Sequence, residues 1–239
     1  MSTLFISDLH LSAERPGITG LFIDFLNTRA REARALYILG DLFEVWLGDD
    51  LVLPDYQPAI DALRQLSAAG VDVYIMYGNR DFLMRDAFEH MTGAALLADE
   101  CIMDLYGTPT LLLHGDTLCT DDVKYQQFRH MVRQPQWQDE LLARSPEERL
   151  ALAKQYRDMS QNETAGKQSE IMDVNQEAVQ SAMRLANVTQ LIHGHTHRPD
   201  THHFELDGQA ATRIVLGDWY HTGDVLICDE HGCQRKILN

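Results

Sequence analysis

The chain has 239 residues, of which 45% are hydrophobic and 23% are charged, and its formal net charge is −16. This length and composition are typical of one folded globular domain with room for an insertion. The negative charge argues against a nucleic-acid partner, because the phosphates would be repelled at long range. For the same reason it provides no general attraction to an anionic membrane surface.

No apolar run approaches the roughly 18 to 20 residues that span a bilayer, and no signal peptide is visible before the first expected strand. The cysteines Cys101, Cys119, Cys228 and Cys233 lack the close paired spacing of a structural zinc site. Cys228 and Cys233 could be bridged across a hairpin, but we expect no disulfide. We therefore expect a cytoplasmic protein with reduced thiols.

Short apolar runs alternate with helical patterns in the first half of the chain, which is typical of a layered α/β fold. In chain order we expect a strand at 4–6, a helix at 17–33, a strand at 35–39, a helix at 57–69 and strands at 71–76 and 110–113. Residues 120–170 are helical and polar, and they interrupt this alternation. A further strand is expected at 189–192, followed by short strands at 202–206, 213–216, 225–228 and 234–238.

Polar clusters directly follow five of the expected strands. They are Asp8-Leu9-His10, Gly40-Asp41, Gly78-Asn79-Arg80-Asp81, His114-Gly115-Asp116 and His193-Gly194-His195-Thr196-His197. Each motif alone is explained by a turn or by structural histidines. Since strand carboxyl ends share one edge of an α/β sheet, the five together should converge at one site.

The residue types in these clusters suit divalent metal ions. Carboxylate, imidazole and amide ligands without thiolate favour manganese, iron, zinc or magnesium. Asp41, alone after its strand, is the candidate bridge between two ions at ~3.5 to 4 Å. Two ions bring about +4, while Asp8, Asp41 and a bridging hydroxide bring about −3. Such a site would attract a phosphate anion and supply hydroxide at neutral pH.

The order D-x-H, G-D, G-N-x-D, H-G and G-H-x-H resembles that of the calcineurin-like metallophosphoesterases. Within this superfamily the chain is similar to the family of diphosphatases that act on UDP-2,3-diacylglucosamine in lipid A biosynthesis. The local matches are residues 6–11, 39–44, 78–82, 114–122, 171–175 and 193–199. The resemblance implies a four-layer α/β/β/α sandwich, with residues 1–239 as a single domain and a helical cap inserted at about 121–170.

The resemblance also implies the site residues. One ion would be held by Asp8, His10, Asp41 and His197, and the other by Asp41, Asn79, His114 and His195. Two Mn²⁺ per chain are expected, with Mg, Zn or Fe as alternatives. Arg80, Asn79 and His195 would be catalytic, and the implied substrate contacts are Asn79, Arg80, Asp122, Ser160, Thr164, Lys167 and His195. His193, Asp116 and His90 are expected to be structural.

The implied reaction is attack of metal-bound hydroxide on the α-phosphorus of UDP-2,3-diacylglucosamine, which gives UMP and 2,3-diacylglucosamine 1-phosphate (lipid X). Many relatives carry histidine where this chain has Arg80. Arginine cannot act as a general acid near neutral pH, but it can stabilise charge on a phosphoryl oxygen. A phosphate leaving group needs no proton donor, so Arg80 favours cleavage of a diphosphate.

Three other functions stay open at this point. The first is a metal-dependent diphosphatase of a soluble nucleotide-sugar or ADP-ribose type of substrate, which would use the same chemistry. The second is a scaffold without turnover, although all seven implied ligands are present. The third is a nucleic-acid phosphodiesterase, which the charge of −16 disfavours.

The helical segment carries both apolar and basic side chains. The apolar ones are Phe128, Met131, Val132, Trp137, Leu141, Leu142, Leu150, Leu152, Tyr156 and Met159, and the basic ones are Arg129, Arg133, Arg144, Arg149, Lys154, Arg157 and Lys167. They predict either a groove for an acyl chain with a basic edge for anionic headgroups, or a helical pair packed on the sheet. Residues 134–140 are polar compared with the family, so we expect only weak peripheral attachment to the cytoplasmic face of the inner membrane.

Overall fold

The computed structural model describes the backbone of residues 1–164 and 173–239, and in the first range it describes side chains up to residue 157. The helices are α1 (Pro16–Asn27), α2 (Gln57–Ala68), α3 (Asp86–Thr92), α4 (Val123–Val132), α5 (Pro135–Leu142), α6 (Pro146–Thr164) and α7 (Gln176–Ala186). The strands are β1 (Thr3–Ile6), β2 (Ala35–Leu39), β3 (Asp72–Met76), β4 (Ala95–Leu97), β5 (Glu100–Leu105), β6 (Thr108–Leu113), β7 (Gln190–His193), β8 (Asp200–Leu206), β9 (Gln209–Val215), β10 (Gly223–Asp229) and β11 (Gly232–Leu238).

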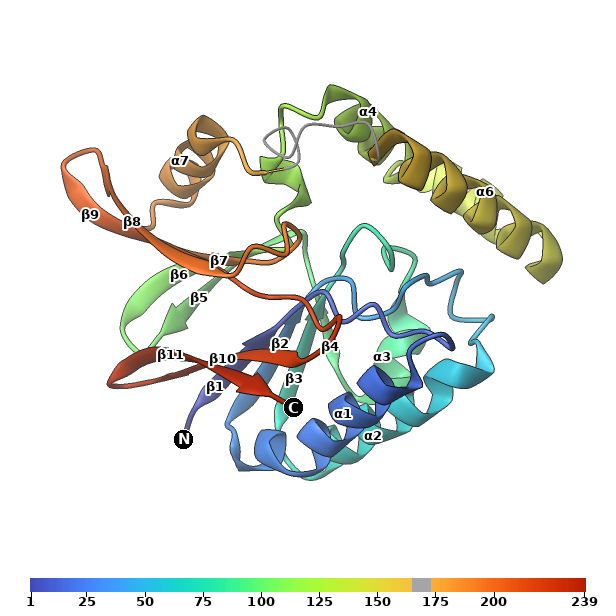
Figure 1. Cartoon of the computed structure of the whole chain (residues 1–239), viewed down its shortest axis with the longest axis horizontal. Helices are drawn as coiled ribbons and strands as arrows, with labels where there is room; N and C mark the ends of the chain where they lie inside the picture. The colour runs from blue at the N-terminus through green and yellow to red at the C-terminus, as the bar shows by residue number, and fades with distance from the viewer. Residues whose placement is uncertain (165–172) are drawn as a thin grey trace.

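The first sheet has six strands in the order β11-β10-β1-β2-β3-β4. β1 to β4 run parallel, while β10 and β11 are antiparallel additions. Helices α1, α2 and α3 cover one face (Figure 1), where Phe22, Leu63 and Phe88 are buried. All five residues of β2 are buried, which is why this strand reads as an unbroken apolar run.

The second sheet has five strands in the order β5-β6-β7-β9-β8. Its outer face carries α7, whose Val179 and Met183 pack with Leu111 and Leu191. A separate core that includes Phe5, Leu39, Met76, Leu112 and Ile192 contains residues of both sheets. The order is therefore helices, sheet, sheet, helix (Figure 1), and the predicted four-layer α/β/β/α sandwich is confirmed.

Most expected elements form within a few residues of their predicted ends, but two kinds of difference occur. The helix expected at 17–33 ends at Asn27, and Arg29–Glu32 forms a 3-10 turn that buries Ala30. The short elements α3, β4 and β5 were not predicted. In β5 most side chains stay at least partly exposed at the edge of the sheet, so the strand lacks an apolar signal.

The helical segment α4–α6 lies in the chain between β6 and β7 and stands beside the sandwich (Figure 1). Salt bridges fix its first helix. Arg129 donates to Asp116 and to Asp99, both at 2.7 Å, and Arg133 donates to Asp99 at 3.2 Å and to the Gly78 carbonyl at 2.9 Å.

Three arginines of the expected basic edge are therefore placed differently. Arg129 and Arg133 are held at the base of the segment, and Arg149 is buried, where it donates to the Leu47 carbonyl and pairs with Asp50. The prediction that these three face membrane headgroups is wrong. Their acidic partners lie far away in sequence, so the charge pattern of the segment alone could not reveal them.

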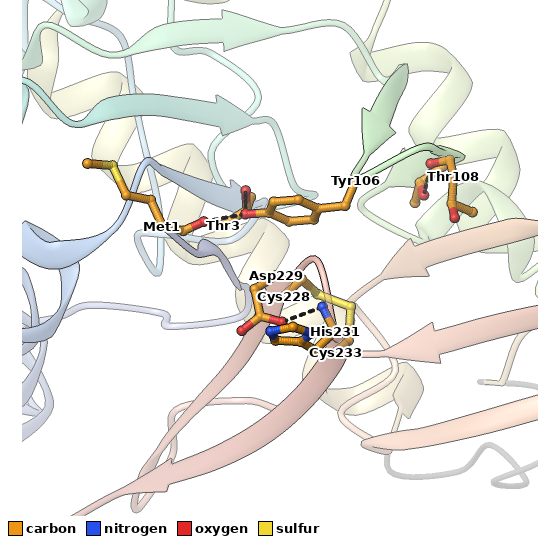
Figure 2. The surroundings of a disulfide bond; sticks show 9 residues. Met1, Thr3, Tyr106, Thr108, Cys228, Asp229, His231 and Cys233 are labelled. Carbon is orange, nitrogen blue, oxygen red and sulfur yellow. Dashed lines mark hydrogen bonds between the residues drawn. A yellow bond between two sulfur atoms is a disulfide. The ribbon is translucent and has the colours of Figure 1, made fainter.

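The expectation of reduced thiols fails at Cys228 and Cys233, which form a disulfide with their Cα atoms 4.1 Å apart. The two residues are direct partners across the β10–β11 hairpin. Figure 2 shows the tight turn, in which the His231 amide donates to the Asp229 carboxylate at 2.8 Å. The hairpin register brings the two sulfurs together. Cys101 and Cys119 are free.

Tyr106 links the β5–β6 hairpin to the first strand of the other sheet (Figure 2). Its hydroxyl donates to the Met1 carbonyl at 2.8 Å and lies 3.2 Å from the Thr3 hydroxyl. These contacts add a polar tie between the two sheets beside their shared apolar core.

Left-handed backbone is concentrated after the strands. Among the described non-glycine residues eight have positive φ, and five of them are Asp8, His10, Asp41, His195 and His197, with φ between 47° and 69°. The other three lie in hairpin turns or at a helix end. Each such residue costs about 1 to 2 kcal/mol, and strain of this kind gathers at functional sites.

We predict that His197→Gly is more stable than His197→Ala by about 1 kcal/mol, because glycine adopts positive φ without the clash of a Cβ. Both variants lack the imidazole, so their difference isolates the backbone. Urea unfolding with a chelator present measures the free energies of unfolding. At His203, within β8, the order should reverse. Equal stabilities of the two His197 variants would contradict the strain.

Candidate metal centre

The polar clusters follow the carboxyl ends of β1, β2, β3, β6 and β7, all of which run parallel to a neighbour in their own sheet. Backbone hydrogen bonds join the loops. The Asp8 amide donates to the Gly40 carbonyl at 3.1 Å, and the Gly194 amide donates to the His114 carbonyl at 2.8 Å. The convergence expected from the sequence therefore occurs at one edge of the two sheets.

One half of the cluster consists of Asp8, His10 and His197, whose potential ligand atoms all lie within 4.8 Å of one another. The two Nε2 atoms of His10 and His197 face each other at 3.3 Å. His197 Nε2 is also 3.3 Å from Asp8 Oδ1. Asp8 Oδ1 is buried without a hydrogen bond of good geometry, so this carboxylate oxygen is available to a cation.

The other half contains Asp41 and His114, grouped with Asp8 within the same 4.8 Å limit. Asn79 Oδ1 lies 3.1 Å from His114 Nε2, and the ring of His195 lies 5.0 Å from that of His114. Asp41 Oδ2 is 3.7 Å from His10 and 3.9 Å from His114. Asp41 therefore stands between the two halves, where a bridging carboxylate has to be.

Fixed contacts hold the carboxylates and imidazoles in place. Asp8 Oδ2 accepts from the Ser7 hydroxyl at 2.6 Å and from the His195 amide at 2.9 Å. Asp41 Oδ1 accepts from the Arg80 amide at 2.8 Å. His114 Nδ1 lies 2.8 Å from the Leu39 carbonyl, which leaves Nε2 free of a proton when Nδ1 donates.

Asp81 connects two of these loops from below. One of its oxygens accepts from the Leu42 amide at 2.7 Å and the other from the Gly78 amide at 2.7 Å. A Cβ at Gly78 would overlap the Asp41 carboxylate, so glycine is what allows the loop after β3 to approach Asp41. This fully buried aspartate orients its neighbours, which the sequence raised only as a possibility.

Burial dominates the electrostatics of the site. It raises the pKa of Asp41 to about 7, with Asp81 and Asp8 adding to the increase. It lowers the pKa of His10 to about 3 and that of His195 to about 4. Against burial, Asp41 and Asp8 raise the pKa of His114 to about 9. Buried carboxylates without cations are costly, and divalent ions would supply the missing positive charge. The donor set therefore fits divalent metal ions.

A cavity of about 900 Å³ extends from this edge between the core loops and the helical segment. Asn79, Arg80 and Glu44 line it beside the cluster, and the rest of the wall is mostly apolar. The apolar wall includes Trp46, Phe82, Phe128, Met131, Trp137, Leu141, Leu150, Leu152 and Tyr156. Seven of these were expected to supply apolar surface, so a groove is present rather than a helical pair packed flat on the sheet.

Arg80 lies where the cluster meets the cavity. Its Nη1 is 3.6 Å from Glu44 Oε1, and its buried Nε has no hydrogen bond to the described residues. Arg157 from α6 approaches the same Glu44 oxygen at 3.3 Å. A guanidinium with a free donor at this position can contact an anionic group that enters from the cavity.

The remaining expected substrate contacts are only partly described. Asp122 is the N-cap of α4, where its side chain accepts from the Tyr125 amide at 3.1 Å. Ser160 and Thr164 belong to α6, but their side chains lie outside the described residues, as does the whole of Lys167.

Four residues near the cluster were missed by the sequence reasoning. Asp218 Oδ2 lies 3.5 Å from His197 Nδ1, and Glu44 Oε2 lies 3.5 Å from His10 Nδ1. The ring of Tyr125 is 5.9 Å from that of His195, and the ring of Tyr220 is 5.5 Å from that of His197. Gly217-Asp218 repeats the glycine-aspartate pattern of Gly40-Asp41 after a strand, which was the available signal.

Comparisons with known proteins agree with this geometry. The family model described as calcineurin-like phosphoesterase matches residues 1–199. A protein of Marinobacter nauticus named UDP-2,3-diacylglucosamine hydrolase is 51% identical over 92% of this chain and 90% of its own length. Proteins with the same name from Photobacterium profundum and Stenotrophomonas maltophilia are 49% and 48% identical, over 99% and 100% of this chain and 96% and 99% of their own lengths. The chain belongs to the calcineurin-like phosphoesterase family.

Proposed function

We propose that this protein hydrolyses the diphosphate bond of UDP-2,3-diacylglucosamine to UMP and 2,3-diacylglucosamine 1-phosphate, a step of lipid A biosynthesis. The observation that carries the proposal is the junction of a cluster fit for metal ions with a mostly apolar cavity of about 900 Å³. A substrate with a diphosphate at one end and acyl chains at the other matches both parts. The names of relatives at about 50% identity support the same substrate.

Two Mn²⁺ ions per chain are part of the proposal. Asp8, His10, Asp41 and His197 would hold one, and Asp41, Asn79, His114 and His195 the other. When bound, the ions supply Lewis acidity to the phosphoryl group and make a water acidic enough to attack at neutral pH. The position of Asp41 between His10 and His114, at 3.7 and 3.9 Å, supports its role as the bridge.

The chain's own residues perform the remaining tasks. Arg80 stabilises the charge that develops on the phosphoryl oxygens, and its position between cluster and cavity places it next to the leaving phosphate. Asn79 and His195 contact the substrate from the metal side. Asp81 keeps the loops of Asp41 and Asn79 in register through its backbone hydrogen bonds.

The segment at about 121–170 acts in this proposal as a cap within a single domain of 1–239. Its helices α4, α5 and α6 form one wall of the cavity, where Phe128, Trp137 and Leu152 contact the acyl chains. Asp122, Ser160, Thr164 and Lys167 complete the substrate contacts. A soluble nucleotide sugar would leave this apolar wall uncovered, which disfavours the alternative substrate.

We also propose a weak peripheral association with the cytoplasmic face of the inner membrane. Among the described residues, no helix combines the length and apolar character required to cross a bilayer. Val123, Met131 and Leu150 are exposed on the helical segment, at the part of the molecule that receives the lipid. Because Arg129, Arg133 and Arg149 are engaged internally, attachment would depend on these apolar side chains more than on charge.

The substrate assignment predicts a strong preference for acyl chains. With Mn²⁺, the protein should release UMP and lipid X from UDP-2,3-diacylglucosamine. Its kcat/KM for deacylated UDP-glucosamine should be lower by roughly 100-fold or more, because the buried apolar contacts are lost. A chelator should abolish turnover and Mn²⁺ should restore it. Equal turnover of both substrates would favour the soluble-substrate alternative.

Arg80→Ala should lower kcat by about 100- to 1,000-fold, because a charge stabiliser of the transition state is removed. Its pH profile should keep its shape, since arginine transfers no proton. Arg85→Ala is the matched control, because Arg85 pairs with Asp139 at the surface. Full diphosphatase activity in Arg80→His would contradict the role of Arg80.

A further inference from the structure

A sixth loop, Gly217–Tyr220 between β9 and β10, reaches the metal edge. The Trp219 amide donates to the Asp8 carbonyl at 3.1 Å, and the buried Trp219 indole donates to the Asp224 carbonyl at 3.1 Å. Asp218 Oδ1 accepts from the Tyr220 amide at 3.1 Å, so its carboxylate is fixed within the loop. The other oxygen, Oδ2, lies 3.5 Å from His197 Nδ1.

The position of this loop is determined by close packing. A Cβ at Gly217 would overlap the Asp224 carboxylate, and the ring of Trp219 packs edge-on against Phe22 and Phe25 of α1. Asp218 is 26% exposed, yet its backbone belongs to a rigid segment anchored at Asp8. Its approach to His197 is therefore a designed contact of the fold rather than a chance meeting of surface side chains.

Glu44 occupies the equivalent position behind the other imidazole. Its Oε2 lies 3.5 Å from His10 Nδ1, and its amide donates to the Leu11 carbonyl at 3.0 Å. Its Oε1 faces Arg80 and Arg157. The charge of Glu44 is thus shared with two guanidinium groups, whereas Asp218 faces His197 without such an intermediary in the contacts described above.

The two imidazoles are held in the same sense. Their Nε2 atoms face each other at 3.3 Å beside Asp8, and their Nδ1 atoms face carboxylates. In the other half, His114 Nδ1 faces the neutral carbonyl of Leu39. A carboxylate behind an imidazole fixes its tautomer, makes it more basic and adds negative charge near the ion, more than a carbonyl does.

We propose that Asp218 and Glu44 are positioning residues that make the half with Asp8, His10 and His197 the tighter of two unequal metal sites. The inference rests on the proposed two-ion centre. It assigns an order of loading, in which the half with His114 and Asn79 fills second and empties first. Second-shell carboxylates of this kind typically contribute 10- to 100-fold in metal affinity.

Titration of the metal-free protein with Mn²⁺, followed by calorimetry and by electron paramagnetic resonance, tests this order. The wild type should bind two ions in separate steps. His197→Ala should remove the tighter step and His114→Ala the weaker one. Asp218→Asn should weaken the tighter step by 10- to 100-fold and leave the weaker one in place. Glu44→Gln should act in the same direction and also lower kcat through Arg80.

Two controls separate positioning from general damage. Asp207→Asn makes the same chemical change at an exposed hairpin, where Asp207 pairs with Arg184, and should alter neither step. The thermal midpoint of metal-free Asp218→Asn should stay within about 2 °C of the wild type, because an exposed ion pair contributes little to stability.

The outcomes distinguish this inference from the function proposed above. If the wild type binds two ions with equal affinity, or if Asp218→Asn weakens both steps equally or only the weaker one, the inference is wrong and the two-ion centre stands. If the wild type binds fewer than two ions, the proposed metal centre itself is wrong, and the inference is lost with it.

Discussion

The structure depends on the burial of like charges at one edge of two sheets. Asp8, Asp41 and Asp81 are all nearly inaccessible to solvent, and His10, His114 and His193 are buried with them. Such a group of carboxylates is costly unless positive charge accompanies it. The protein meets part of the cost with backbone amides directed at Asp8 and Asp81. Divalent cations would meet the rest, which makes ion binding and the integrity of this edge one physical problem.

The division of labour between the sandwich and the helical segment follows from this constraint. Ligands that must be held within a fraction of an ångström come from tight loops after buried strands, several of them in strained left-handed conformations. The helical segment is attached through α4 by the pairs of Arg129 and Arg133 and contributes apolar surface. Chemistry and substrate size are thus set by separate parts of the chain, which meet at Arg80.

Features carried by local sequence could be predicted, and features carried by register could not. Asp8, Asp41 and His114 each follow an apolar run directly, so their convergence was visible from the strand order. Asp218 and Glu44 matter only because particular nitrogen atoms of His197 and His10 face them, and no spacing encodes that. Arg129 was misread because its partners Asp99 and Asp116 precede it by many residues. The Cys228–Cys233 bond followed from hairpin register, which the sequence indicated but which we underweighted.

Anomalous diffraction at the manganese edge, from crystals grown with Mn²⁺, tests the central claim most directly. The account predicts two peaks about 3.5 to 4 Å apart, with the Asp41 carboxylate contacting both. One peak should lie among Asp8, His10 and His197, and the other beside Asn79, His114 and His195. A single ion, or two ions of which only one touches Asp41, would contradict it.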